Sequence, residues 1–201
     1  MKNMSPRKRQ AALTHKAIYN AALLLFAKKG YDDVTVDDIC LKAHVSKGAF
    51  YLHFKSKDKI PLEQFAKTDE YVRNNLVQRI EALERTEDKL FTYVVSTYEY
   101  INKEIGFANM KVMYQIQLAS DKSSKVVSEN RTLYVILKSI ITSAQEKGEV
   151  RCDKSIYDIT VSLLRMYRGI VLEWCLANGT SDLVEEGKRM FPLMWDGIRQ
   201  R

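Results

Sequence analysis

Apolar side chains recur every three or four residues along most of this chain, which is the period of a helix with one buried face. The first such segment covers residues 10–29 and ends at Lys28-Lys29-Gly30. Cations stabilise the last turn of a helix, and glycine accepts the positive φ that often follows it. The pattern therefore predicts a helix over 10–29, followed by a short connector over 31–34.

Two short helices are predicted next. Thr35 can cap the first, which has acidic residues in its first turn and spans about two turns from residue 36 to 43. After a three-residue turn, Ser46 can cap the second, over 47–53. Ser56 is then expected to cap a longer helix that begins at Lys57 and runs to about residue 84.

Amphipathic segments follow at 87–103, 107–118, 123–147, 153–177 and 182–199. The chain shows no clear alternating strand pattern and no internal repeat, and its three prolines and eight glycines favour long helices. The prediction is an all-α fold of about nine helices.

The positive charge is concentrated at one end of the chain. Residues 1–59 carry twelve Lys or Arg and five Asp or Glu, so the whole net charge of +7 lies in this part. Such an asymmetry favours a polyanionic partner, with nucleic acid first and an anionic membrane surface second.

Composition excludes several other classes. No stretch is apolar enough to span a membrane, and no apolar run follows the basic start as it would in a secretory signal. Three widely spaced cysteines indicate a reducing cytoplasm. We find no nucleotide-binding loop, no paired catalytic carboxylates and no nucleophile with a suitable base. The sequence therefore predicts neither an enzyme nor a bound cofactor or metal.

Two short helices joined by a three-residue turn form a helix-turn-helix, the unit that places its second helix in the major groove of DNA. In the segment 47–53, Phe50 pairs with Phe54 one turn later, and we expect both to be buried. Gly48 and Ala49 are then left on the outer face. Such small residues suit a helix that must approach a groove wall closely.

The motifs of this region occur in a recognisable order and spacing. They are Ala21-Ala22-x-x-Leu25-Phe26, Gly30-Tyr31, Thr35-Val36-x-x-Ile39, Ala43, and Val45-Ser46-Lys47-Gly48-Ala49-Phe50-Tyr51-x-His53-Phe54-Lys55-Ser56-Lys57. From about residue 18 to 60 the chain resembles the TetR family of bacterial transcription repressors. The remaining part matches that family only in the number and length of its helices.

The resemblance implies a DNA-binding domain over 1–60 and an effector-binding and dimerisation domain over 61–201. It also implies specific DNA contacts. Thr35 is expected to bind phosphate through its hydroxyl and backbone N–H. The residues expected near base edges are Ser46, Lys47, Gly48 and Ala49, and those expected to contact phosphates are Tyr51, His53 and Lys57.

Three positions depart from the family pattern. Leu52 stands where an aromatic residue is common, and we expect this to change a base or methyl contact. His44 stands where a glycine is usual in the turn, and a histidine can take the left-handed conformation at some cost. Pro61 lies early in the fourth predicted helix, where we expect it to remove a hydrogen bond and bend the first turns.

The second half of the chain is rich in methionine and tyrosine, which suit an adaptable ligand cavity. The resembled family binds its effectors between the fifth and eighth helices, and the corresponding candidates here are Tyr98, Met110, Met113, Tyr114, Tyr134, Met166 and Trp174. The last two helices have wide apolar faces that a homodimer would bury, with candidates Leu163, Ile170, Leu183, Met190, Met194 and Trp195.

The prediction for function is a cytoplasmic regulator, most simply a repressor, that binds double-stranded palindromic operator DNA as a homodimer. A small, largely apolar effector would release it by changing the tilt of the fourth helix. Two alternatives remain at this point, an activator with the same fold and a helical adaptor on an anionic membrane.

Overall fold

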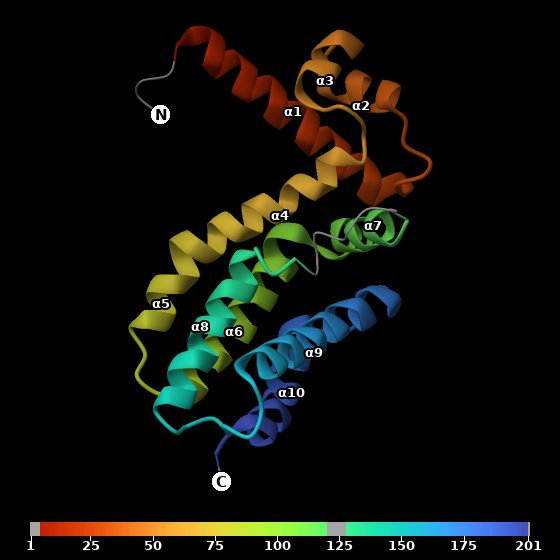
Figure 1. Cartoon of the computed structure of the whole chain (residues 1–201). Coiled ribbons are helices and arrows are strands. Elements are labelled where there is room, and N and C mark those ends of the chain that lie inside the picture. The colour runs from red at the N-terminus through yellow and green to blue at the C-terminus, as the bar shows by residue number, and fades with distance from the viewer. Residues whose placement is uncertain (1–4, 120–127, 201) are drawn as a thin grey trace.

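The computed structural model describes residues 5–119 and 128–200, and these are almost entirely helical (Figure 1). The elements are α1 (Pro6–Lys29), α2 (Val36–Ala43), α3 (Lys47–His53), α4 (Lys59–Tyr71), η1 (Val72–Leu76), α5 (Val77–Glu81), α6 (Thr86–Tyr100), η2 (Ile101–Ile105), α7 (Phe107–Leu118), α8 (Thr132–Glu146), α9 (Ile156–Leu176) and α10 (Leu183–Ile198).

The π-helical turns η1 and η2 continue the helices before them, so α4–η1–α5 and α6–η2 are each one unbroken helix. Counted in this way, the described residues form nine helices. The prediction of an all-α fold is confirmed. Within the same residues the only β-type pairing is an isolated antiparallel bridge between Val150 and Arg199.

The two short N-terminal helices begin at the predicted caps. Thr35 and Asp38 form a complete capping box at α2, and the Ser46 hydroxyl accepts a hydrogen bond from the Ala49 N–H at α3. Between the helices, His44 takes the left-handed conformation with φ 54° and ψ 46°. The sharp turn thus forms without the glycine that the family pattern uses there.

The start of α4 differs from the prediction. The helix begins at Lys59, after Asp58, and not at Lys57 under a Ser56 cap. Pro61 therefore occupies the third helical position, where a backbone N–H has no partner within the helix. For this reason the expected loss of a hydrogen bond at Pro61 is wrong. The continuous helix also ends at Glu81, before the predicted residue 84.

Among the later helices, α7 has the predicted bounds of 107–118. The helix predicted over 123–147 begins at Thr132 instead, and residues 123–127 of that prediction lie outside the described residues. Helices α9 and α10 begin after Ser155 and Asp182, whose side chains accept hydrogen bonds from the first-turn N–H groups.

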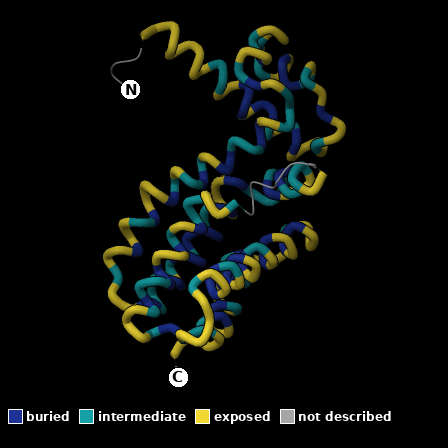
Figure 2. The backbone as a smooth tube through the Cα atoms, in the orientation of Figure 1, coloured by how far each residue is buried: buried dark blue, intermediate teal, exposed yellow. Residues whose placement is uncertain are grey.

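Two hydrophobic clusters divide the molecule, and Figure 2 shows their buried stretches in dark blue. The smaller joins α1, α2 and α3 to the first turn of α4 at Ile60, and the larger begins at Phe65 of the same helix and extends to α10. The predicted domain boundary between residues 60 and 61 lies between Ile60 of the smaller cluster and Phe65 of the larger one. One residue of α7, Val112, belongs to the smaller cluster, so α7 touches both.

None of the helices formed by residues 5–119 and 128–200 is both long and apolar enough to cross a membrane.

Candidate DNA-binding surface and ligand cavity

Helix α3 lies at one end of the molecule, beside α2 and against α1 (Figure 1). Phe50 and Phe54 are buried in the smaller cluster, as expected from their spacing. Ser46, Lys47 and Gly48 are exposed at the start of the helix. The capped start of this helix, with a lysine beside it, is chemically suited to an anionic surface.

The rest of the outer face of α3 is less uniform. Tyr51 is 55% exposed and its ring stands edge-on to Phe50. Ala49 and His53 are half-buried. The His53 ring meets the edge of His15 on α1, with 5.7 Å between ring centroids, and His15 pairs with Glu63 of α4 at 2.9 Å. His53 therefore also ties α3 to α1.

Lys47 is an exposed cation at the start of α3, and it carries an intramolecular partner. Its ammonium lies 2.8 Å from a carboxylate oxygen of Asp37 on α2. The hydrogen bond to Asp37, followed by the charge of that carboxylate, raises the pKa of Lys47. A phosphate that binds Lys47 must compete with this carboxylate.

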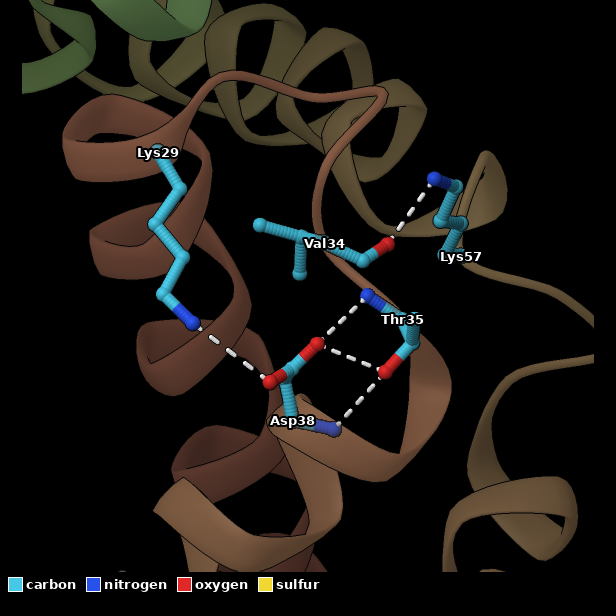
Figure 3. Close-up of polar contacts among 5 residues, drawn as sticks. All are labelled: Lys29, Val34, Thr35, Asp38 and Lys57. Carbon is cyan, nitrogen blue, oxygen red and sulfur yellow. Dashed lines mark hydrogen bonds and ion pairs between the residues drawn. The ribbon is translucent and has the colours of Figure 1, made fainter.

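Thr35 uses the donors that were predicted to bind phosphate within its own capping box. Its backbone N–H and its hydroxyl both donate to Asp38 Oδ2, at 2.9 and 2.6 Å, and the hydroxyl accepts from the Asp38 N–H (Figure 3). These bonds, with Lys29 3.4 Å from the same carboxylate, lower the pKa of Asp38. Thr35 thus fixes the start of α2, and the phosphate contact through these donors is not formed by this geometry.

Lys57 also has a different place from the predicted one. Its ammonium donates to the carbonyl oxygens of Tyr31 and Val34, both at 2.9 Å, and lies 3.4 Å from that of Asp32. Figure 3 shows the Val34 bond. The Lys57 ammonium also lies 4.4 Å from the centre of the Tyr31 ring. An ammonium has three hydrogens, and all three are engaged, so Lys57 holds the α1–α2 connector and is not free to bind phosphate.

The second half of the chain contains a small, mostly apolar cavity of about 70 Å³ between α4, η2, α7 and α9. Met110, Met113 and Tyr114, all predicted pocket residues, line it together with Phe65 and Thr68 of α4. Burial raises the pKa of Tyr114, and it raises that of Tyr167 in the same wall to about 12, so both hydroxyls remain neutral donors. The cavity reaches α4, the helix that begins beside the DNA-binding unit.

A larger hollow of about 600 Å³ adjoins this cavity and shares three of its wall residues, Tyr114, Leu164 and Arg168. Tyr134, also a predicted pocket residue, lines this outer hollow. The two spaces together offer a small apolar interior and a wider opening.

Three other predicted pocket residues lie elsewhere. Tyr98 is fully buried behind the cavity wall, where its ring stacks on Tyr167 and its hydroxyl donates to the Tyr167 carbonyl at 3.0 Å. Trp174 packs edge-on against Phe107 and donates to the Ser181 carbonyl. Met166 points outward and is 37% exposed. None of the three lines the cavity between α4, η2, α7 and α9, so the prediction is wrong for these residues.

The predicted dimer residues are mostly inside the protomer. Leu163, Ile170, Leu183 and Met194 belong to the larger core cluster and are at most 8% exposed. They cannot offer a surface to a second chain, so these four assignments are wrong. Met190 and Trp195 are half-buried at the rim of the cluster.

The exposed apolar residues of the same two helices include three leucines, Leu172, Leu176 and Leu193, at 37%, 74% and 70% exposure. The sequence pattern missed them because a wide apolar stripe does not show which edge faces the core. The sequence pattern also did not place Arg168 in the cavity wall, because an arginine in an amphipathic helix is usually solvated.

The comparisons with known proteins agree with this geometry. The family model described as bacterial regulatory proteins, tetR family, matches residues 18–63. The biofilm operon icaADBC negative transcriptional regulator IcaR of Staphylococcus aureus is 30% identical over 180 residues, which cover 87% of this chain and 90% of IcaR. The transcriptional repressor BepR of Brucella suis is 24% identical, covering 98% of this chain and 97% of BepR.

The match to the transposon Tn10 protein TetC of Escherichia coli is 33% identical but spans only 51% of TetC. Among solved structures, the fatty acid degradation regulator FadR of Bacillus halodurans superposes with a TM-score of 0.74, 19% identity and full coverage of both chains. FadR of Bacillus subtilis, solved in complex with stearoyl-CoA, has a TM-score of 0.72 and 21% identity, covering 91% of this chain and 98% of that one.

Proposed function

Since this chain belongs to the TetR family of bacterial regulatory proteins, we propose that it is a cytoplasmic transcriptional repressor that a small effector releases from DNA. The observation that carries the proposal is the path of α4. Its first turn belongs to the core of the helix-turn-helix, and Phe65 and Thr68 further along line the cavity. One helix thus joins a DNA-binding unit to a ligand cavity.

In the proposed complex, α3 enters the major groove and presents Lys47, Gly48 and Tyr51 to the DNA. Two copies reading a palindrome would be one helical turn apart, about 34–36 Å. Lys47 would exchange Asp37 for a phosphate or a base edge. Because much of the affinity would come from phosphate contacts, binding should weaken steeply as salt rises.

The homodimer is supported by the outer faces of α9 and α10. Leu172, Leu176 and Leu193 are large apolar side chains exposed on two adjacent helices at the end of the chain. Their burial against a second copy would stabilise a symmetric bundle, at about 25 cal/mol per Å² of apolar surface removed from water.

A second connection between the two halves runs through a buried glutamine of α4. Gln64 accepts a hydrogen bond from the Tyr19 hydroxyl of α1 and donates to the Tyr100 hydroxyl of α6 at 3.2 Å. Buried polar groups of this kind are costly to leave without partners. A ligand that shifts α4 must therefore either carry α1 with it or break these bonds.

The proposal is tested by binding the purified protein to genomic DNA fragments, footprinting the bound sites, and measuring affinity for a labelled site by fluorescence anisotropy. Lys47→Ala should weaken binding at least tenfold while leaving the circular dichroism spectrum unchanged. Lys138→Ala, which removes an exposed lysine of α8, is the matched control and should bind like the wild type. A reporter gene behind the same site should be expressed more strongly when the regulator is deleted.

Specific binding that survives Lys47→Ala and Tyr51→Ala unchanged would contradict the assignment of α3. Loss of reporter expression on deletion would show an activator.

A further inference from the structure

Arg168 lines both the inner cavity and the outer hollow, at the place where the two spaces meet. It is the one charged group at this junction for which the described residues provide no counterion. Within the described parts of the chain, no carboxylate lies at ion-pair distance from its guanidinium, and the positive charge of Arg131 adds to the desolvation that lowers its pKa. Arg131 itself is satisfied, because its Nε contacts both carboxylate oxygens of Asp69 at 2.8 and 2.9 Å.

The surroundings of Arg168 make this lack of a partner costly. The residue is half-buried, and desolvation lowers its pKa, although a guanidinium stays charged at every physiological pH. Tyr114 and Tyr167 flank it with neutral rings, and the Tyr114 hydroxyl donates to the Arg168 carbonyl at 3.4 Å. A partly desolvated cation without an anion is unfavourable, and an anion brought by a ligand would relieve it.

The two spaces differ in character on either side of this arginine. Inward, the wall is formed by Ile101, Ile105, Met110 and Met113, with no unpaired charge among the described residues. Outward, the hollow is larger and carries Arg165 and Glu129 at its rim. The inner space of about 70 Å³ is smaller than typical ligand pockets of about 300–1,000 Å³, so a ligand must displace flexible methionines and extend past Arg168.

From this arrangement we propose that the effector is an anionic amphiphile, with an apolar chain or ring system in the inner cavity and a carboxylate or phosphate bound by Arg168 at its mouth. The inference rests on the proposed function, since it names the chemical class that the regulatory cavity accepts. It refines the largely apolar effector expected from the sequence by adding one negative charge at a defined place.

The test uses four ten-carbon probes and the full-length protein, with affinities measured by isothermal titration calorimetry at one salt concentration. Decanoate and decyl phosphate carry the anion, 1-decanol is neutral, and decyltrimethylammonium is cationic. The wild type should bind the two anions at least tenfold more tightly than decanol, and the cation most weakly. The ratio between the anions shows whether a carboxylate or a phosphate is preferred.

Arg168→Gln should reduce the ratio of decanoate to decanol affinity to about one and leave decanol binding unchanged. Because the readout is a ratio within one variant, a general loss of stability does not imitate it. Arg79→Gln, on α5, removes the same charge from an exposed position that lines neither space and should change the ratio less than twofold.

Equal binding of decanoate and decanol by the wild type would overturn the anion preference while leaving a ligand cavity in place. An equal loss of preference in both arginine variants would assign it to the general positive field of the protein and also overturn the proposal, as would the absence of binding by all four probes. None of these results affects DNA binding, whose failure would be seen separately in the footprinting experiment and would contradict the proposed function itself.

Discussion

Gly187 of α10 lies where the helix packs against the ring of Tyr98, and this contact leaves no room for a methyl group. A Cβ at residue 187 would lie 2.4 and 2.5 Å from two ring carbons of Tyr98 and 3.4 Å from a methyl of Val94. The ring cannot move away easily, because it stacks on Tyr167 with 4.7 Å between centroids and its hydroxyl bonds the Tyr167 carbonyl. Gly187→Ala should therefore force a shift of the ring inside a closed core.

Two effects of this substitution oppose each other. Alanine is favoured over glycine in a helix interior by about 1 kcal/mol. Overpacking of a core costs about 1–3 kcal/mol, and the upper part of that range applies here because the contact is about 1 Å too short for a fully buried aromatic ring. We expect a net loss of about 1–2 kcal/mol in the free energy of unfolding.

Gly169 of α9 provides the matched control. It is an exposed glycine in a helix interior, and a Cβ there would meet nothing within 4 Å. Gly169→Ala should raise the free energy of unfolding by about 0.5–1 kcal/mol through helix propensity alone. Urea denaturation followed by far-ultraviolet circular dichroism, at one protein concentration because the protein is expected to dimerise, measures both variants. If Gly187→Ala is as stable as Gly169→Ala, the packing argument is refuted.

Three further predictions concern the DNA-binding unit. Lys57→Met should lower the free energy of unfolding by about 1–2 kcal/mol, since it removes the bonds that hold the α1–α2 connector, and an unchanged urea midpoint would contradict that role. Asp37→Asn should raise affinity for the operator about two- to fivefold at low salt by freeing Lys47, with a smaller gain at high salt; anisotropy titrations at two salt concentrations test this. Asp38 has a lowered pKa in the folded protein, so its stabilising effect is complete above the ordinary pKa of about 3.9 and is lost as the pH falls through the folded value. The difference in urea midpoint between the wild type and Asp38→Asn should accordingly shrink as the pH is lowered from 7 to 3, and a constant difference would refute the role of the capping box with Thr35.

The sequence predicted best those features that depend on neighbours in the chain. Thr35 and Ser46 cap the helices expected of them, and His44 takes the left-handed turn, because a cap requires only the next three residues. The start of α4 lies two residues later than predicted, because the helix begins after Asp58, whose side chain forms no capping hydrogen bond, and not under Ser56.

Features that depend on tertiary packing could not be predicted in the same way. Lys57 looked like a free cation in the motif, yet its ammonium is used by carbonyls more than twenty residues earlier. The apolar stripe of α9 predicted that Leu163 and Ile170 could form an interface, whereas both are in the core and Leu172 is outside. Which edge of an amphipathic helix faces solvent is set by the helices that pack on it, and periodicity does not contain that information.

The same packing offers a physical reason why a ligand in the cavity can affect the distant α3. Consecutive residues of α7 belong to different hydrophobic clusters, with Met113 in the cavity wall and Val112 in the core of the helix-turn-helix. A helix transmits displacement because its backbone hydrogen bonds keep neighbouring residues in a fixed relation, and close-packed cores resist small continuous deformation. A ligand that pushes Met113 aside therefore moves Val112 as well, or it must deform α7. A ligand needs to favour the shifted arrangement by only a few kcal/mol to change the population of DNA-binding molecules. The pairing of a ligand anion with the Arg168 guanidinium is an interaction of this size.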